Sequence, residues 1–83
     1  MKTYTYEEIM QEVMTMTSEV LGIRPDRMKE DDDFINDLGA DSHLKERLFL
    51  MVEDFFKKEI EAKARGRIET PKELAGYFIN WLS

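Results

Sequence analysis

Residues 22–41 have no sustained hydrophobic period, although they separate two segments whose apolar residues recur at helical spacing. Connections of this length without regular structure are uncommon in small compact domains, and they are usually either functional or disordered. Gly22, Pro25 and Gly39 interrupt any regular element here. Apolar residues at intervals are expected to anchor the connection to a core, and these are Ile23, Met28, Phe34, Ile35 and Leu38. The sequence therefore predicts an ordered, functional loop that distinguishes the chain from an ordinary up-and-down bundle.

A first helix is predicted over residues 5–21, because apolar residues recur there at spacings of three and four. Thr5 and Glu8 form a capping box at its start, and Gly22 is a natural stop after its end. The predicted apolar face consists of Tyr6, Ile9, Met10, Val13, Thr17, Val20 and Leu21. One side of this helix is therefore expected to be buried.

A second helix is predicted from about Ser42 to Lys58, with one broad apolar face that we expect to be core. That face consists of Leu44, Leu48, Met51, Val52, Phe55 and Phe56. Residues 59–69 are polar and basic, with Ile60 and Ile68 as their only strongly apolar members. A loop or one short irregular helix is expected over this stretch.

The last helix has the clearest predicted start in the chain. Thr70 is placed as its N-cap, Pro71 at its first helical position, and Glu73 closes a capping box. Its predicted apolar side consists of Leu74, Tyr77, Phe78, Trp81 and Leu82.

These elements predict an all-α fold, with three main helices and at most one short irregular helix packed as a small antiparallel bundle. No segment has a strand pattern, and the length of 83 residues indicates one domain over residues 1–83. A domain of this size buries only about 60% of its unfolded surface, so its core must be built from few residues. A deep active site with several catalytic groups is therefore not expected.

The net charge is −6, and the imbalance lies in one segment. Residues 30–41 contain 6 of the 18 acidic residues and no base, so the other 12 acids balance the 12 bases elsewhere. The acids of this segment are Glu30, Asp31, Asp32, Asp33, Asp37 and Asp41. Such a field repels nucleic acid and steers basic partner surfaces towards the loop. A solvated loop without a partner is the alternative interpretation.

The chain has no cysteine, which excludes disulfides and cysteine-based metal sites and favours a cytoplasmic protein. The first residues lack the apolar stretch of a signal peptide, and no apolar run approaches the ~20 residues that span a bilayer. We therefore expect neither export nor membrane insertion.

Ser42 stands at the predicted start of the second helix, where it is either the N-cap or a residue of the first turn. Most serines at helix starts only cap. A helix N-terminus also offers unpaired N–H groups and the positive end of the helix dipole, and both stabilise a phosphodiester on that hydroxyl. The position is therefore suited to hold a phosphate.

The string Asp37-Leu38-Gly39-Ala40-Asp41-Ser42 resembles the phosphopantetheine attachment motif of acyl carrier proteins, and the resemblance extends over nearly the whole chain. In that family a long loop follows the first helix, and the modified serine opens the second helix. A short irregular third helix and a Thr-capped fourth helix complete the bundle. Glu59-Ile60, Ile68 and Thr70 stand where such a carrier has them.

The resemblance implies that a phosphopantetheinyl transferase, with a divalent metal, moves 4′-phosphopantetheine from coenzyme A to Ser42. Asp41 is the neighbour expected to assist that recognition, and Asp37, Leu38 and Gly39 are expected to shape the approach to the serine. The thiol of the arm then carries acyl groups as thioesters between acyl-loading and acyl-transferring enzymes. Tethering raises the effective concentration of the cargo. The chain is thus expected to be a monomeric carrier and not an enzyme.

The sequence departs from the family pattern after the serine, where carriers usually have an aliphatic residue and an acidic second helix. Residues 42–67 contain seven bases and five acids. The residues expected to be read by partners are His43, Lys45, Glu46, Arg47 and Leu50. We therefore predict dedicated partners with acidic or mixed-charge surfaces, in a specialised fatty-acid, lipid or polyketide-type pathway.

Other chemistry is poorly supported. Ser42 and His43 point about 100° apart on a helix, so they do not form a nucleophile and base pair. A single histidine without cysteine predicts no metal site, and the acid run from Asp31 lacks the glycine that a calcium loop requires, with Asn36 in its place. No acid, base and nucleophile constellation supports an enzyme.

Two alternatives remain open from the sequence. The chain could be an unmodified helical interaction module in which Ser42 is only a cap, or a peptidyl or aminoacyl carrier, although Gly39-Ala40 fits the acyl type better. The methionines at positions 10, 14, 16, 28 and 51 are expected to fill core or surface, and the alternative is an interior that opens to hold an acyl chain.

Overall fold

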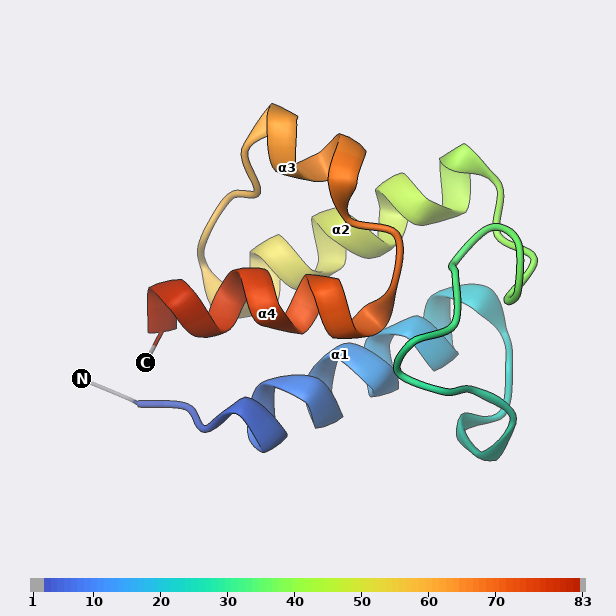
Figure 1. Ribbon diagram of the computed structural model, residues 1–83, viewed down its shortest axis with the longest axis horizontal. Coiled ribbons are helices and arrows are strands. Elements are labelled where there is room, and N and C mark those ends of the chain that lie inside the picture. The colour runs from blue at the N-terminus through green and yellow to red at the C-terminus, as the bar shows by residue number, and fades with distance from the viewer. Residues whose placement is uncertain (1–2, 83) are drawn as a thin grey trace.

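The computed structural model describes residues 3–82, and for Trp81 and Leu82 it describes the backbone alone. Over these residues the chain forms α1 (Tyr6–Leu21), a 3-10 turn η1 (Pro25–Arg27), α2 (Ser42–Phe56), α3 (Ala62–Arg67) and α4 (Pro71–Leu82). Residues 3–82 contain no strand. The predicted all-α fold is confirmed, with the short irregular helix present as α3 (Figure 1).

α1 begins and ends where local signals place it. Thr5 N–H donates to Glu8 Oε1 at 2.9 Å, and Glu8 N–H donates to Thr5 Oγ1 at 3.1 Å, which completes the predicted capping box. Gly22 ends the helix in the left-handed region at φ 68°. The predicted apolar face is correct at Ile9, Met10, Val13 and Thr17, which are buried, but Tyr6 is exposed because it opens the helix at the edge of the bundle.

α1 packs against both α2 and α4, and η1 lies against the α1 side of the bundle (Figure 1). Phe56 of α2 and Phe78 of α4 stack with their ring centroids 5.0 Å apart, which joins these two helices through the core. The buried core further includes Ile9, Met10, Val13, Met16, Phe34, Leu48, Phe49, Val52, Ile60, Ile68 and Leu74. Each large apolar side chain buried in this way contributes about 1.5–3 kcal/mol to folding.

The long loop is hydrogen-bonded to the segment before α4 and to the first turn of α4. Phe34 N–H donates to the Glu69 carbonyl at 2.8 Å, and Lys72 N–H donates to the Glu30 carbonyl at 2.8 Å. Among the predicted anchors, Phe34 is fully buried and Met28 nearly so, while Ile23 and Leu38 are partly buried. Ile35 was wrongly predicted as an anchor: it is 44% exposed, because it follows Phe34 in a tight turn and only one of the two can face the core.

The predicted apolar face of α2 is wrong on one flank. Phe49, which was not predicted to be core, is buried, whereas Met51 and Phe55 are 37% and 45% exposed. The Phe49 ring packs edge-on against Phe34 of the loop, with 6.2 Å between ring centroids, and the Arg65 guanidinium of α3 lies 5.9 Å from its centre. The helix also ends at Phe56, before the predicted Lys58, because Lys57 adopts the left-handed region at φ 59°.

α3 is held by polar contacts to the rest of the bundle. Arg65 bonds Glu46 and Glu53 of α2, each at 2.7 Å, and Glu53 Oε2 also accepts a hydrogen bond from Ile60 N–H at 2.6 Å. Tyr77 of α4 accepts a hydrogen bond from Glu61 N–H at 3.1 Å. These contacts place a short helix that local sequence signals leave undefined.

α4 starts as predicted, with Thr70 Oγ1 accepting a hydrogen bond from Glu73 N–H at 3.1 Å. The reciprocal bond differs from the predicted capping box, because Glu73 Oε1 accepts from Glu69 N–H at 2.9 Å. Leu74 and Phe78 are buried and Tyr77 is partly buried. The predicted packing of Trp81 and Leu82 lies outside the side chains that the structure describes.

Candidate functional site

Asp41 is the N-cap of α2, and Ser42 is therefore the first helical residue. Asp41 has an extended backbone at φ −99° and ψ 179°, and its Oδ1 accepts a hydrogen bond from Leu44 N–H at 2.8 Å. The choice that the sequence left open, cap or first turn, is thus decided for the first turn. The Ser42 hydroxyl is consequently not required for capping.

The surroundings of Ser42 fit an attached phosphate ester. The residue is exposed, and its hydroxyl makes no hydrogen bond to any residue between 3 and 82. The first intrahelical donor is Lys45 N–H, which bonds the Asp41 carbonyl at 3.0 Å, so the Ser42 and His43 N–H groups precede the helical ladder. These two N–H groups and the helix dipole provide the positive potential that a phosphodiester needs.

The acidic loop before Ser42 is shaped by its own carboxylates. Asp33 Oδ1 accepts hydrogen bonds from the Ile35 and Asn36 N–H groups, each at 2.9 Å. Asp37 Oδ2 accepts from Asp33 N–H at 2.8 Å, which closes the turn from the other side. These bonds give two of the acids a structural role beyond the electrostatic one that the sequence predicted.

Gly39 ends this turn and leads the chain into α2. It adopts φ 75°, and a Cβ at this position would meet nothing within 4 Å. Its requirement is therefore conformational, since other residues rarely adopt this region. Gly39 N–H bonds the Ile35 carbonyl at 3.2 Å, and Ala40 N–H bonds the Phe34 carbonyl at 2.9 Å. The predicted site residues Asp37, Leu38 and Gly39 thus belong to the turn that precedes Asp41 and Ser42.

The residues predicted to be read by partners divide into two groups. His43, Arg47 and Leu50 are exposed, and their i, i+4, i+7 spacing puts them on one face of α2. Lys45 Nζ instead lies 5.6 Å from the centre of the Phe49 ring, and Glu46 is paired with Arg65. Lys45 and Glu46 are therefore already engaged within the molecule.

Two exposed apolar residues beside this face were missed by sequence reasoning. Met51 and Phe55 lie on the flank of α2 away from α3, and their helical spacing made them look like core. Which flank is covered depends on Phe34 of the loop and Arg65 of α3, both distant from these residues in sequence, so no local signal could have identified them.

Two other kinds of feature, a metal-binding cluster and a membrane-spanning helix, are absent from the described residues. In residues 3–82, no cluster of His, Cys, Asp or Glu side chains could hold a metal ion. Over the same stretch, no helix is long and apolar enough to cross a membrane.

The site thus consists of an exposed serine at the first position of α2, behind an aspartate N-cap and an ordered loop, which is an arrangement that fits a carrier domain. Comparison with known proteins agrees. The profile of the family described as "PP-binding: Phosphopantetheine attachment site" matches residues 11–78. The acyl carrier protein of Prochlorococcus marinus (strain MIT 9515) is 41% identical over 64 residues, covering 77% of this chain and 80% of that protein. The acyl carrier protein of Guillardia theta is 34% identical over 71 residues, covering 86% and 88%.

Solved structures have the same fold. The acyl carrier protein from Enterococcus faecalis superposes with a TM-score of 0.77 at 30% identity, covering 96% of this chain and all of that one. The HMG-ACPI domain of the CurA module from Lyngbya majuscula gives a TM-score of 0.86 at 24% identity, covering 100% and 83%, and this likeness concerns the fold. The chain belongs to the acyl carrier protein family, whose prosthetic group is 4′-phosphopantetheine. Members of this family carry their substrates and are not catalysts, so the chain is a carrier and not an enzyme.

Proposed function

We propose that Ser42 is the residue that receives 4′-phosphopantetheine and that the chain carries acyl groups on this arm between enzymes. The observation that supports the proposal best is the unbonded, exposed Ser42 hydroxyl at the first position of α2. The arm supplies a thiol that holds the acyl group as a thioester. The residues of this chain hold and present the attachment point.

Asp41 is proposed to assist modification by fixing the start of α2. Asp41 Oδ1 already accepts a hydrogen bond from Leu44 N–H, so Asp41 acts first by holding Ser42 in position at the start of the helix. The predicted contact with the transferase is a second role. Gly39 and the Asp33–Asp37 turn set the direction from which the chain enters the helix. Together they keep the hydroxyl accessible and leave the N–H groups of Ser42 and His43 available to a phosphate attached there.

The proposed partners are a phosphopantetheinyl transferase and enzymes that load and remove the acyl group, with the carrier acting as a monomer in the cytoplasm. Of the five residues predicted for recognition, His43, Arg47 and Leu50 form a continuous exposed face, which favours them as direct contacts. Lys45 and Glu46 contribute from the edge of that face. The positive charge of Arg47 supports partners with acidic or mixed-charge surfaces, and hence a specialised fatty-acid, lipid or polyketide-type pathway.

The proposal is tested by intact mass spectrometry after incubation with coenzyme A, magnesium and a broad-specificity phosphopantetheinyl transferase. The expected result is a gain of one phosphopantetheine that is absent in Ser42→Ala. Ser18→Ala is the matched control, because the Ser18 hydroxyl is bonded to the Ile23 carbonyl and is not expected to be modified. No gain in a folded sample would contradict the proposal and favour an unmodified interaction module.

A further inference from the structure

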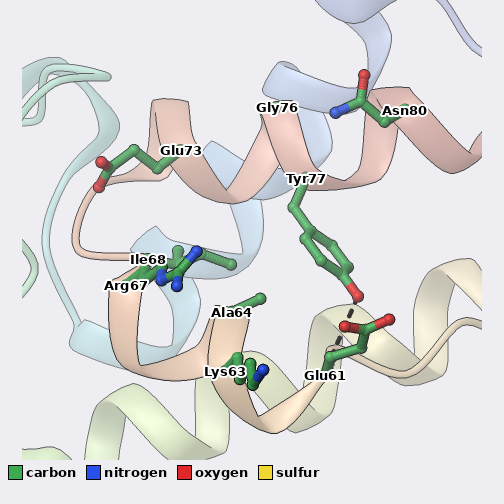
Figure 2. Close-up of a pocket in the computed structure, with 9 residues that line it drawn as sticks. All are labelled: Glu61, Lys63, Ala64, Arg67, Ile68, Glu73, Gly76, Tyr77 and Asn80. Carbon is green, nitrogen blue, oxygen red and sulfur yellow. Dashed lines mark hydrogen bonds between the residues drawn. The ribbon is translucent and has the colours of Figure 1, made fainter.

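A groove of about 350 Å³ lies between α3 and α4 (Figure 2). Ala64 of α3, Ile68 directly after α3 and the ring of Tyr77 supply its apolar lining, and Asn80 adds an amide from α4. The Tyr77 ring reaches from α4 to the start of α3, where its hydroxyl meets Glu61 N–H (Figure 2). This volume is in the range of small-molecule sites.

Gly76 keeps the α4 wall of the groove open. It lies in the interior of α4 without a positive φ, and a Cβ built on it would meet nothing within 4 Å. Glycine in a helix interior is destabilising relative to alanine, so neither backbone conformation nor close packing explains it here. Its one visible effect is the space that it leaves between Tyr77 and Asn80 of the same helix.

Two unpaired cations line the α3 wall. Lys63 and Arg67 are exposed, are four residues apart, and make no ion pair with any residue between 3 and 82. Like charges at this spacing repel each other and destabilise a helix. Arg65, on the same short helix, differs because it is bonded to Glu46 and Glu53. The cations of the groove thus lack the internal partners that Arg65 has.

The two acids of the groove do not neutralise these cations. Glu73 Oε1 accepts hydrogen bonds from Glu69 N–H at 2.9 Å and from the Thr70 hydroxyl at 3.3 Å, so it is engaged at the start of α4. Glu61 lines the groove at the start of α3 and makes no ion pair among residues 3–82. Its carboxylate opposes an anionic ligand, and its removal is therefore an informative test.

We propose that the groove binds a carboxylate at the end of a short aliphatic stem. Lys63 and Arg67 pair with the carboxylate, and the stem lies on Ala64, Tyr77 and the space beside Gly76. The ligand is either the far end of a cargo held at Ser42 or a free small acid. The C-terminal end of α3 and the N-terminal end of α2 lie towards the same end of the bundle (Figure 1), which is compatible with a tethered source.

The test is a ¹⁵N–¹H NMR titration of the unmodified chain with hexanoate at constant ionic strength, so it does not depend on modification of Ser42. We expect saturable shifts of the groove amides in residues 63–68 and 76–80. Acetate, which lacks the stem, and hexanamide, which lacks the charge, are expected to shift them much less. Equal shifts with acetate or with hexanamide, or none with hexanoate, would overturn the proposal.

Variants make the test specific. Lys63→Met and Arg67→Met should each weaken hexanoate binding by about fivefold, as expected for exposed charge pairs, and Glu61→Gln should strengthen it. Gly76→Leu should abolish binding by filling the groove, and Gly76→Ala should weaken it. Gly66→Ala is the matched control, since Gly66 also lies in a helix with open space around it but does not line the groove. An equal loss in Gly66→Ala would contradict the proposal.

A second experiment distinguishes the two sources of the carboxylate. A chain that carries a glutaryl thioester on the phosphopantetheine arm of Ser42 has a distal carboxylate, whereas the pentanoyl form has an acyl chain of the same length without one, and this experiment rests on the proposed function. Groove shifts in the glutaryl form alone would support a tethered ligand. Binding of hexanoate without such shifts would support a free acid.

Discussion

Replacement of Arg65 by alanine tests how α3 is held on α2. Arg65 Nη2 lies 2.7 Å from Glu53 Oε2, and Nη1 lies 2.7 Å from Glu46 Oε2. The Glu53 side chain is 12% exposed, whereas the Glu46 side chain is 53% exposed. Because solvent screens the second pair far more than the first, the two pairs contribute unequally to stability.

The magnitude follows from what remains after Arg65 is removed. The Glu46 pair is exposed and contributes at most about 1 kcal/mol. Glu53 would keep one hydrogen bond, from Ile60 N–H, but would lose the opposite charge in a largely buried position. Breaking a fully buried pair costs about 3–5 kcal/mol, and partial exposure of Arg65 reduces this figure. We therefore expect Arg65→Ala to lower the free energy of unfolding by about 2–3 kcal/mol, or Tm by about 10–20 °C.

Urea denaturation followed by circular dichroism measures this change. Glu46→Gln is the matched control and should cost less than about 1 kcal/mol. The double variant Arg65→Ala with Glu53→Leu removes the unpaired carboxylate and should recover much of the lost stability. A loss below about 1 kcal/mol in Arg65→Ala, or a double variant no more stable than the single one, would refute the reasoning.

Substitutions at three further positions test the backbone before the serine and at the other end of α2. Lys57→Gly should raise the free energy of unfolding by about 0.5–1 kcal/mol, because Lys57 adopts φ 59°, a region that glycine tolerates better than lysine. Urea denaturation measures the change, and a destabilised variant would contradict this prediction. Gly39→Ala should lower the free energy of unfolding by about 1 kcal/mol, because Gly39 adopts a positive φ, and should slow modification of Ser42. Mass spectrometry over time measures the rate of modification, and an unchanged rate would argue against the role of the turn. Asp41→Ala should lower the free energy of unfolding by about 1 kcal/mol because it removes the cap on Leu44 N–H, whereas Asp41→Asn should keep most of that stability. Slower modification of Ser42 in Asp41→Asn, in spite of its retained cap, would then indicate a contact between the Asp41 carboxylate and the transferase.

The helix starts were predictable because each depends on a few adjacent residues. Thr5 with Glu8, and Thr70 with Pro71, carry their capping information within one turn, and the structure keeps both. The position of Ser42 was predictable only to within one residue. Serine and aspartate are both good N-caps, so the choice between Asp41 and Ser42 depends on the backbone conformation that the preceding loop imposes.

The buried flank of α2 was not predictable because it depends on an element distant in sequence. Phe49 and Phe55 are equally apolar, and a helical period accommodates either beside Leu48 and Val52. Phe34 of the loop packs against the Phe49 ring, and the Arg65 guanidinium of α3 lies 5.9 Å from the centre of that ring. In the same way, Phe34 and Ile35 are adjacent residues, and the hydrogen bond from Phe34 to the Glu69 carbonyl fixes which of them faces the core.

α2 thus has two uses that fall on different sides of one helix. The side towards α3 carries Glu46 and Glu53, and its charges are paired with Arg65. The adjoining exposed face, opposite the core, carries His43, Arg47 and Leu50, and neither His43 nor Arg47 makes an ion pair within residues 3–82. Acidic residues counted along α2 therefore overstate the negative charge that a partner meets, because Arg65 offsets part of it. The exposed face carries Arg47 and, one turn after Leu50 on the same face, Asp54, so a partner meets charges of both signs there. Such a face favours partners of mixed charge.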